Sequence, residues 1–302
     1  MANRRQHTIP QFYLKKFLSP GWVYRHGAEK PRLHKSPTNV AVHQDYYGRN
    51  KAVMKPLDDL NKYIEDKGAP SFTKLIKDIG SITDYDWHVL SFVFGNIFVR
   101  TPAHIEEWRD AVLKGTDEIN AKAGGMIDRL ISASLDDSDL SEFRSETNDE
   151  SSATLKQLNE YAAKLKAIGG HRVAALDLFS TLPDIAECIR QMTFIIWKAP
   201  NNHFYLTSDR PLVVQSRKTG SRAHAGWAKP DALGTIAVSP SHFLTMFYYK
   251  LSGIYLLEAT QEQVAGLNLE TIRFAKNEVY STFEYPEAND WMKAVGRCHP
   301  KE

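Results

Sequence analysis

The chain has 302 residues, of which 42% are hydrophobic and 25% are charged, and its formal net charge is +2. This composition is typical of a globular protein with a sizeable core, and it excludes a disordered or fibrous chain. Cys188 and Cys298 are too few for a disulfide framework, no apolar run is long enough to predict a membrane span, and no signal sequence is visible. We therefore expect a cytoplasmic protein that makes no contact with a membrane.

Basic residues are concentrated near the N-terminus. Residues 1–55 contain eleven lysines and arginines against Glu29 and Asp45, which gives a local charge of +9, whereas the remaining residues carry −7. Such a segment is typical of a surface for an acidic partner, so nucleic acid, a nucleotide or an acidic protein is an expected ligand. The alternative is that the two oppositely charged parts neutralise each other in the folded protein.

One amphipathic helix is predicted near the start of the chain, with Pro10 at its first helical position. Tyr13, Leu14 and Phe17 have the spacing of a single apolar stripe, which can dock this helix on a core. His7 then lies just before the helix, where the positive end of the helix dipole disfavours an imidazolium ion. A histidine kept neutral in this way is suited to act as a base or as a ligand.

Further helices are predicted in the first half of the chain. The spacing of Leu57, Leu60 and Ile64 indicates a helix that ends at Gly68, and Pro70 is expected to begin another.

Residues 84–99 form the most apolar predicted helix, which we expect to be buried because it is hydrophobic on all sides. Arg100 follows directly, so this cation requires an anion or carbonyl groups nearby. Thr101 can cap the helix that Pro102 begins.

The second half of the chain differs in composition. Acidic, serine-rich residues 136–152 are expected to be a mobile loop between a mainly helical half (1–135) and a helix-plus-sheet half (153–302) of one domain (1–302). The predicted fold class is α+β, with a helical N-terminal half and a C-terminal, mostly antiparallel sheet flanked by helices. Strands are predicted at residues 22–25, 32–34, 40–42, 193–197, 204–207, 212–214, 235–238, 244–249 and 279–281, and a helix at 261–276.

Signatures of known catalytic sites, such as a P-loop or a zinc-binding pattern, are missing. The best candidate is the segment LTSDRP, residues 206–211, in which an apolar strand leads to Thr207, Ser208 and Asp209 and is ended by proline. A carboxylate at a strand end is well placed for catalysis or ligand binding. The alternative is a turn in which Asp209 accepts hydrogen bonds from nearby backbone N–H groups.

Other polar residues also allow two interpretations. Arg100 and Glu65 are expected to be ion-pair partners. Arg100 can serve either to bind an anionic ligand or as a structural ion-pair partner. Asn268 falls on an apolar helix stripe, where its default role is to bind backbone carbonyl groups. The simplest interpretation of Asn39 is a turn residue. The alternative is that its side-chain amide binds a ligand.

Several of these residues follow one order along the chain: HxxPxxYLxxF from His7 to Phe17, the Asn39 loop before Tyr46 and Tyr47, Glu65, Arg100-Thr101-Pro102, TSDxP ending at Pro211, and Asn268 before Phe274. In this order the chain resembles the uncharacterised, mainly bacterial family called domain of unknown function 4238. The resemblance covers nearly the whole chain, and its specific parts are the opening pattern and TSDxP. The family brings no established activity, so the resemblance implies no catalytic roles.

If these motifs converge in space, they supply the groups that a hydrolase or a phosphate-handling enzyme needs. His7 and Asp209 would then transfer protons or hold a divalent metal, Glu65 would orient them and Arg100 would hold a phosphate. No metal-binding set is assigned. The catalytic candidates are His7, Glu65, Arg100 and Asp209, and the ligand-binding candidates are Asn39, Tyr47, Thr207, Ser208 and Asn268.

The alternative hypothesis is a binding module without catalytic activity. In this case the basic face of residues 1–55 holds nucleic acid or an acidic protein, and the polar motifs form a structural network.

Overall fold

A computed structural model describes residues 5–18, 23–27, 32–34, 40–44, 51–115, 117, 160, 163, 170–222, 226–250 and 253–298. The chain divides into two compact units, of which the first combines Met1–Ala103 with Phe179–Glu302 and the second is His104–Leu178. The candidate residues Asn39 and Tyr47 and the acidic segment 136–152 lie outside the described residues. All other candidate residues belong to the first unit.

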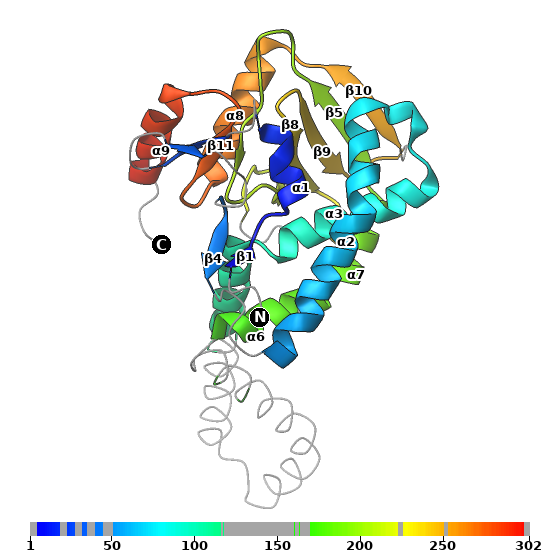
Figure 1. The fold of residues 1–302 in the computed structure, drawn as a ribbon, viewed down its shortest axis with the longest axis vertical. Helices are drawn as coiled ribbons and strands as arrows, with labels where there is room; N and C mark the ends of the chain where they lie inside the picture. Colours follow the sequence, from blue (N-terminus) through cyan, green and yellow to red (C-terminus); the bar gives the residue numbers. More distant parts are fainter. Residues whose placement is uncertain are drawn as a thin grey trace, which may run out of the picture. The chain divides into compact units, whose positions relative to one another are not determined.

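The described residues form three sheets, and Figure 1 shows the largest of them. Its strand order is β10 (Ile254–Glu258), β5 (Thr193–Lys198), β9 (His242–Phe247), β8 (Ala232–Ser239) and β7 (Val213–Ser216). The pairs in this sheet are antiparallel except for β10 and β5, which run parallel. A four-stranded sheet has the order β3 (Arg32–His34), β2 (Val23–His26), β11 (Val279–Ser281) and β6 (Thr207–Ser208). In the smallest sheet, β1 (Arg5–His7) pairs with β4 (Val42–Gln44).

The α-helices with described bounds are α1 (Gln11–Leu14), α2 (Lys51–Lys77), α3 (Asp84–Val99), α6 (Gly170–Ser180), α7 (Leu182–Arg190), α8 (Gln261–Phe274) and α9 (Pro286–Cys298). Residues 102–115 are also helical, and the short 3-10 helices η1 (Lys15–Phe17) and η3 (Ile79–Ser81) follow α1 and α2. Helices dominate the described part of the first half, and the largest sheet lies in the second half with helices beside it (Figure 1). The predicted α+β class is confirmed.

Several predicted elements are correct and others need correction. The pairing of residues 22–25 with 32–34 is confirmed by β2 and β3. The strand expected at residues 40–42 is shifted to β4, at residues 42–44. Of the strand expected at 204–207, only Thr207 is in a strand, as the first residue of β6. Neither β10 nor α9 was predicted.

The predicted helix end at Gly68 is wrong, because α2 continues without interruption to Lys77. A Cβ atom at Gly68 would lie 2.2 Å from Cγ2 of Val93 in α3, so this glycine allows the two helices to approach closely. Pro70 also lies inside α2, although its ring removes one helical hydrogen bond. Its position is exposed, so water can bind the carbonyl group that loses its partner. Packing against α3 therefore decides the course of α2.

The start of the chain also differs from the prediction. The helix α1 has only four residues, Pro10 is its N-cap, and a 3-10 turn completes the segment. His7 lies further upstream, in strand β1, where it pairs with Val42. The strand pairing, and not a helix N-terminus, therefore fixes the backbone of His7.

Buried aromatic rings join α1, α2, α3 and the largest sheet into one core. The ring centroids of Tyr13 and Phe72 are 6.0 Å apart, those of Phe72 and Phe94 are 6.1 Å apart, and those of Phe94 and Phe194 are 5.8 Å apart. All four side chains are at most 1% exposed. The apolar stripe predicted for Tyr13 thus docks α1 on this core, and it fixes the position of α1 beside α2.

One buried carboxylate, that of Asp86, also joins α2 to the start of α3. Asp86 forms a capping box with Thr83 and accepts hydrogen bonds from Ser71 (2.6 Å) and Lys74 (2.8 Å) of α2. Burial raises the pKa of Asp86, but the hydrogen bonds from Lys74, Ser71 and Thr83 outweigh it and hold the pKa below its usual range.

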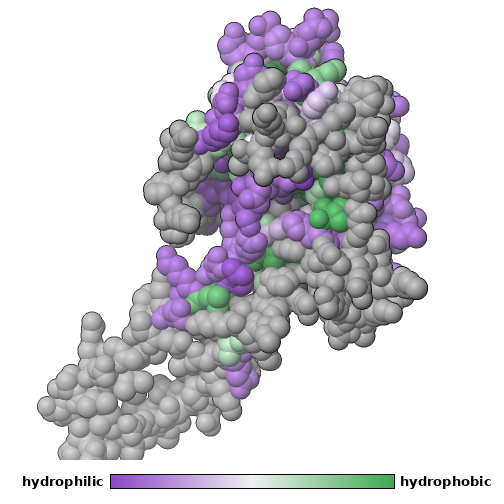
Figure 2. Space-filling view, turned by 60° about the vertical axis from the view of Figure 1, so that its left-hand side comes forward, coloured by the Kyte–Doolittle hydropathy of each residue, from purple (hydrophilic) through white to green (hydrophobic). Residues whose placement is uncertain are grey.

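The surface in Figure 2 is predominantly hydrophilic where it is coloured, with small separate hydrophobic areas. Within the described residues, no helix has the length and the apolar character that a membrane span requires.

Candidate functional site

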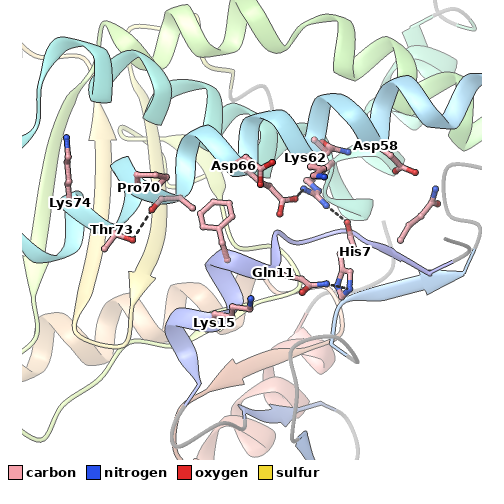
Figure 3. Close-up of a pocket in the computed structure, with 15 residues that line it drawn as sticks. His7, Gln11, Lys15, Asp58, Lys62, Asp66, Pro70, Thr73 and Lys74 are labelled. Carbon is pink, nitrogen blue, oxygen red and sulfur yellow. Dashed lines mark hydrogen bonds and ion pairs between the residues drawn. The ribbon is translucent and has the colours of Figure 1, made fainter. Parts of the chain in front are cut away.

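A pocket of about 1030 Å³ lies between α1 and α2 and includes residues of β1 and the end of α3 (Figure 3). Its α2 wall is a polar stripe with helical spacing, formed by Asp58, Asn61, Lys62, Glu65 and Asp66 and continued to Thr73 and Lys74. Leu57, Ile64, Phe72 and Leu75 of the same helix are buried. The helix α2 therefore packs with one face and leaves a charged face toward the pocket.

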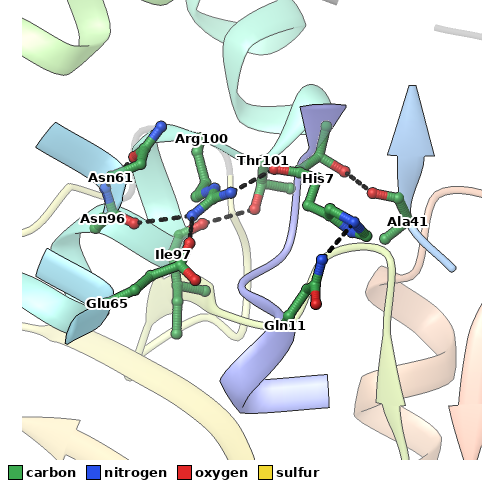
Figure 4. Close-up of polar contacts among 10 residues, drawn as sticks. His7, Gln11, Ala41, Asn61, Glu65, Asn96, Ile97, Arg100 and Thr101 are labelled. Atoms are coloured by element: carbon green, nitrogen blue, oxygen red, sulfur yellow. Dashed lines mark hydrogen bonds and ion pairs between the residues drawn. The ribbon is translucent and has the colours of Figure 1, made fainter. Parts of the chain in front are cut away.

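His7 lines this pocket with a half-buried side chain. Its Nε2 atom lies 2.7 Å from Nε2 of Gln11, in the first turn of α1 (Figure 4). A side-chain amide nitrogen can only donate, so with the amide in this orientation Nε2 of His7 is the acceptor. The Nδ1 atom is buried, which leaves Nε2 as the nitrogen on the pocket side.

Arg100 holds the backbone of His7 in place. Its Nη2 group donates a short hydrogen bond to the His7 carbonyl, and Nη1 donates to Oε1 of Glu65 at 2.6 Å and to Oδ1 of Asn96 at 3.4 Å (Figure 4). The predicted need of Arg100 for an anion or carbonyl groups is thus confirmed. Arg100 is only 4% exposed, and both of its terminal nitrogens donate to protein atoms. The geometry gives Arg100 a positioning role.

A second polar layer supports this arrangement. Nδ2 of Asn96 donates to Oδ1 of Asn61 at 2.7 Å, which connects α3 to α2 beside the Arg100–Glu65 pair. Asn61 and Asn96 are both buried, and their side chains face each other directly. The network thus holds the three elements that carry His7, Glu65 and Arg100 in fixed positions.

Charged side chains surround the opening of the pocket. Lys15 and Lys62 are exposed, and neither forms an ion pair within the part of the chain that the structure describes, whereas Lys74 binds Asp86 at 2.8 Å. Burial raises the pKa of Asp58; the charge of Arg100 opposes this shift and Asp59 adds to it. Figure 3 shows His7, Gln11, Lys62 and Asp58 at one end of the pocket and Thr73 and Lys74 at the other.

Asp209 lies outside the residues that line this pocket. Its carboxylate accepts hydrogen bonds from the backbone N–H groups of Lys276 (2.8 Å), Asn277 (2.7 Å) and Glu278 (3.2 Å), after the end of α8. Burial raises the pKa of Asp209 to about 6, the bonds from Lys276 and Asn277 oppose the shift, and the charge of Glu278 increases it. Asp209 thus accepts hydrogen bonds from backbone N–H groups, as in the alternative interpretation, but the donors belong to a segment distant in sequence and not to a local turn.

The other described ligand-binding candidates lie in strand β6 or beside it. Thr207 contacts the Tyr13 hydroxyl at 2.6 Å, and the Ser208 hydroxyl binds the backbone of Arg210. Asn268 accepts from the Leu206 N–H group and donates to the Phe204 carbonyl, both at 2.9 Å. The polar atoms of these side chains are therefore bonded to the protein itself.

The structure thus separates the predicted site residues into two groups. His7, Glu65 and Arg100 come together at the pocket, whereas the other described candidates lie at β6. Thr207 and Ser208 form this strand, Asp209 follows it directly, and Asn268 binds the backbone just before it. The pocket residues Gln11, Asp58 and Lys62 were not predicted, although the polar stripe on α2 is a signal that helical spacing could have revealed. No group of three or more His, Cys, Asp or Glu side chains suited to a metal ion occurs among the described residues.

The two sequence motifs meet in the folded protein. Tyr13 of the opening pattern donates to the Ala237 carbonyl at 2.7 Å and accepts from Thr207 of TSDxP.

A comparison with protein families gives a match between residues 5–283 and the family described as "Protein of unknown function (DUF4238)". The chain belongs to this family. Comparisons with curated proteins and with solved structures gave no match.

Proposed function

We propose that this protein is a hydrolase or phosphate-handling enzyme whose ligand, a nucleotide or the phosphate backbone of nucleic acid, binds in the pocket between α1 and α2. One observation carries the proposal: an imidazole held by Gln11 shares an open pocket with two exposed lysines, Lys15 and Lys62, that lack an ion-pair partner in the described structure. A volume of about 1030 Å³ is sufficient for a ligand of nucleotide size. The basic character of residues 1–55 supports a phosphate-bearing ligand.

In the proposed reaction the lysines bind the phosphate and His7 is the general base. His7 accepts a proton at Nε2 from a water molecule whose oxygen forms a bond to phosphorus, while the bond from phosphorus to the leaving oxygen breaks. Nε2 has one lone pair, which the Gln11 amide occupies in this structure, so the Gln11 side chain moves aside and the water molecule takes its place at Nε2 before the proton is transferred. Asp58, a carboxyl group with a raised pKa, donates a proton to the leaving oxygen. Glu65 and Arg100 position His7.

The first experiment measures binding of nucleoside phosphates and of a labelled single-stranded oligonucleotide to the full chain. Replacing Lys15 and Lys62 by alanine is expected to weaken binding by about tenfold, since both charges that face the phosphate are lost. The matched control replaces Lys229 and Lys250, two exposed lysines outside the pocket, and removes the same net charge. Equal losses in both variants would show that binding is unspecific and would contradict the pocket assignment.

The second experiment separates an enzyme from a binding module. If His7 is the base, His7→Ala abolishes product formation while the affinity for the ligand changes little. One observation favours the binding-module alternative: both terminal nitrogens of Arg100 donate hydrogen bonds to protein atoms, as expected of a structural residue. A ligand that binds in the pocket and stays intact with the wild-type protein would favour that alternative.

A further inference from the structure

Strand β10 forms one margin of the five-stranded sheet, and no strand of the described chain pairs with its outer side (Figure 1). Its sequence is IYLLE, and Tyr255, Leu256 and Leu257 are 41%, 48% and 42% exposed. Neighbouring side chains of a strand point to opposite faces, so β10 presents apolar groups to solvent on both faces of the sheet. Edge strands are usually protected by lysine, proline or a bulge, and residues 254–257 contain none of these.

The hydrogen bonds between β10 and β5 determine which backbone groups face outward. The Phe194 N–H group donates to the Gly253 carbonyl at 2.9 Å, and the Ala259 N–H group donates to the Lys198 carbonyl at 2.8 Å. Backbone groups alternate between the two sides of a strand, so the odd-numbered residues of this segment bind β5. The even-numbered residues direct N–H and C=O to the outer side: Ile254, Leu256 and Glu258.

We propose that this edge is the interface of a homodimer, in which β10 pairs antiparallel with β10 of a second copy across a two-fold axis at Leu256. In this register Leu256 faces its own copy, and Ile254 faces Glu258 of the partner. These are the residues with outward backbone groups, so each opposing pair exchanges N–H···O=C bonds in both directions. Tyr255 faces Leu257 of the partner, which covers exposed apolar side chains on the same face of the sheet.

The charges of β10 are compatible with a second copy. Its one charged residue, Glu258, already binds Lys198 at 2.9 Å. The two-fold axis places Glu258 opposite Ile254, so the glutamates of the two chains lie at opposite ends of the interface. The edge is therefore complementary to itself in its backbone groups, its apolar side chains and its charge.

The test measures the mass of the full chain in solution by light scattering, from low to high micromolar concentration. The wild-type protein is expected to show twice the mass of one chain at the upper end. Leu256→Pro is expected to raise the Kd of the dimer by about tenfold or more, because it removes the central pair of hydrogen bonds. Proline at this position keeps the bonds to β5, which use Tyr255 and Leu257, so thermal unfolding of the monomer should change little.

The matched control is Leu269→Lys, which removes another exposed leucine (43% exposed) on α8 and should leave the dimer intact. A wild-type chain that is monomeric at every concentration would overturn the proposal, as would a dimer that persists in Leu256→Pro. A dimer that is lost equally in both variants would locate the interface elsewhere and also contradict it.

Discussion

The two sides of the α1–η1 segment use polar groups in different ways. On the sheet side, the Tyr13 hydroxyl is fully buried and is bonded to Thr207 and Ala237. On the pocket side, Gln11 and Lys15 line the pocket between α1 and α2 together with His7. Polar residues of a shared motif thus serve two purposes, since those on one side complete the fold and those on the other remain accessible to a ligand. The predictions below test this division, beginning with the largest expected effect.

Asn268→Ala is expected to lower the free energy of unfolding by about 4 kcal/mol. The substitution leaves the Leu206 N–H group and the Phe204 carbonyl without their partner, and an unsatisfied buried group costs about 1–3 kcal/mol. Chemical denaturation provides the measurement. Gln261→Ala, at an exposed position of the same helix, should change stability by less than about 0.5 kcal/mol. A small effect of Asn268→Ala would remove it from the structural group.

Asp209 is expected to make stability depend on pH. Its pKa in the folded protein is about 6, above the reference value of 3.8, so between these values the folded chain holds a proton that the unfolded chain has released. The contribution of Asp209 to stability is therefore complete below pH 4 and decreases by about 3 kcal/mol as pH rises through 6.

The measurement is the difference in unfolding free energy between wild type and Asp209→Asn from pH 4 to 7. Taking the difference cancels the contribution of His26, whose pKa burial lowers to about 4 and whose effect on stability has the opposite sign. A difference that does not vary with pH would show that Asp209 titrates normally, and that its three backbone hydrogen bonds balance the effect of burial.

Tyr13→Phe is expected to lower the free energy of unfolding by about 2 kcal/mol, because it keeps the ring but leaves two buried partners unsatisfied. Adding Thr207→Val should cost less than the two single changes together, since one of the stranded groups is then removed. A double-mutant cycle by chemical denaturation measures this coupling. Additive effects would mean that the two motifs do not support each other at this contact.

The sequence predicts those features that depend on local spacing. The stripe of Tyr13, Leu14 and Phe17, the buried helix at residues 84–99 and the need of Arg100 for an anion are all confirmed. Each of these follows from residues within a few turns of one another or from the cost of burying a charge.

Features that depend on distant partners are beyond such an analysis. Asp209 binds backbone groups of residues 276–278, and no side chain there marks them as donors. Sequence spacing predicts a helix end at Gly68, because its close approach to Val93 of another helix is visible only in the structure. Strand β10 pairs parallel with β5, which an argument from short connections cannot anticipate.

His7→Ala carries the smallest expected change in stability and is the sharpest test of the division. The fold uses the carbonyl group of His7, which Arg100 binds, and the backbone pairing of β1, and the substitution preserves both. The contact of the imidazole with Gln11 is partly exposed, so losing it should lower the free energy of unfolding by less than about 1 kcal/mol in chemical denaturation. A loss as large as that of Tyr13→Phe would place the imidazole with the structural groups. A small loss leaves the ring available for chemistry, because the fold holds it in place through the backbone and gains little from the ring itself.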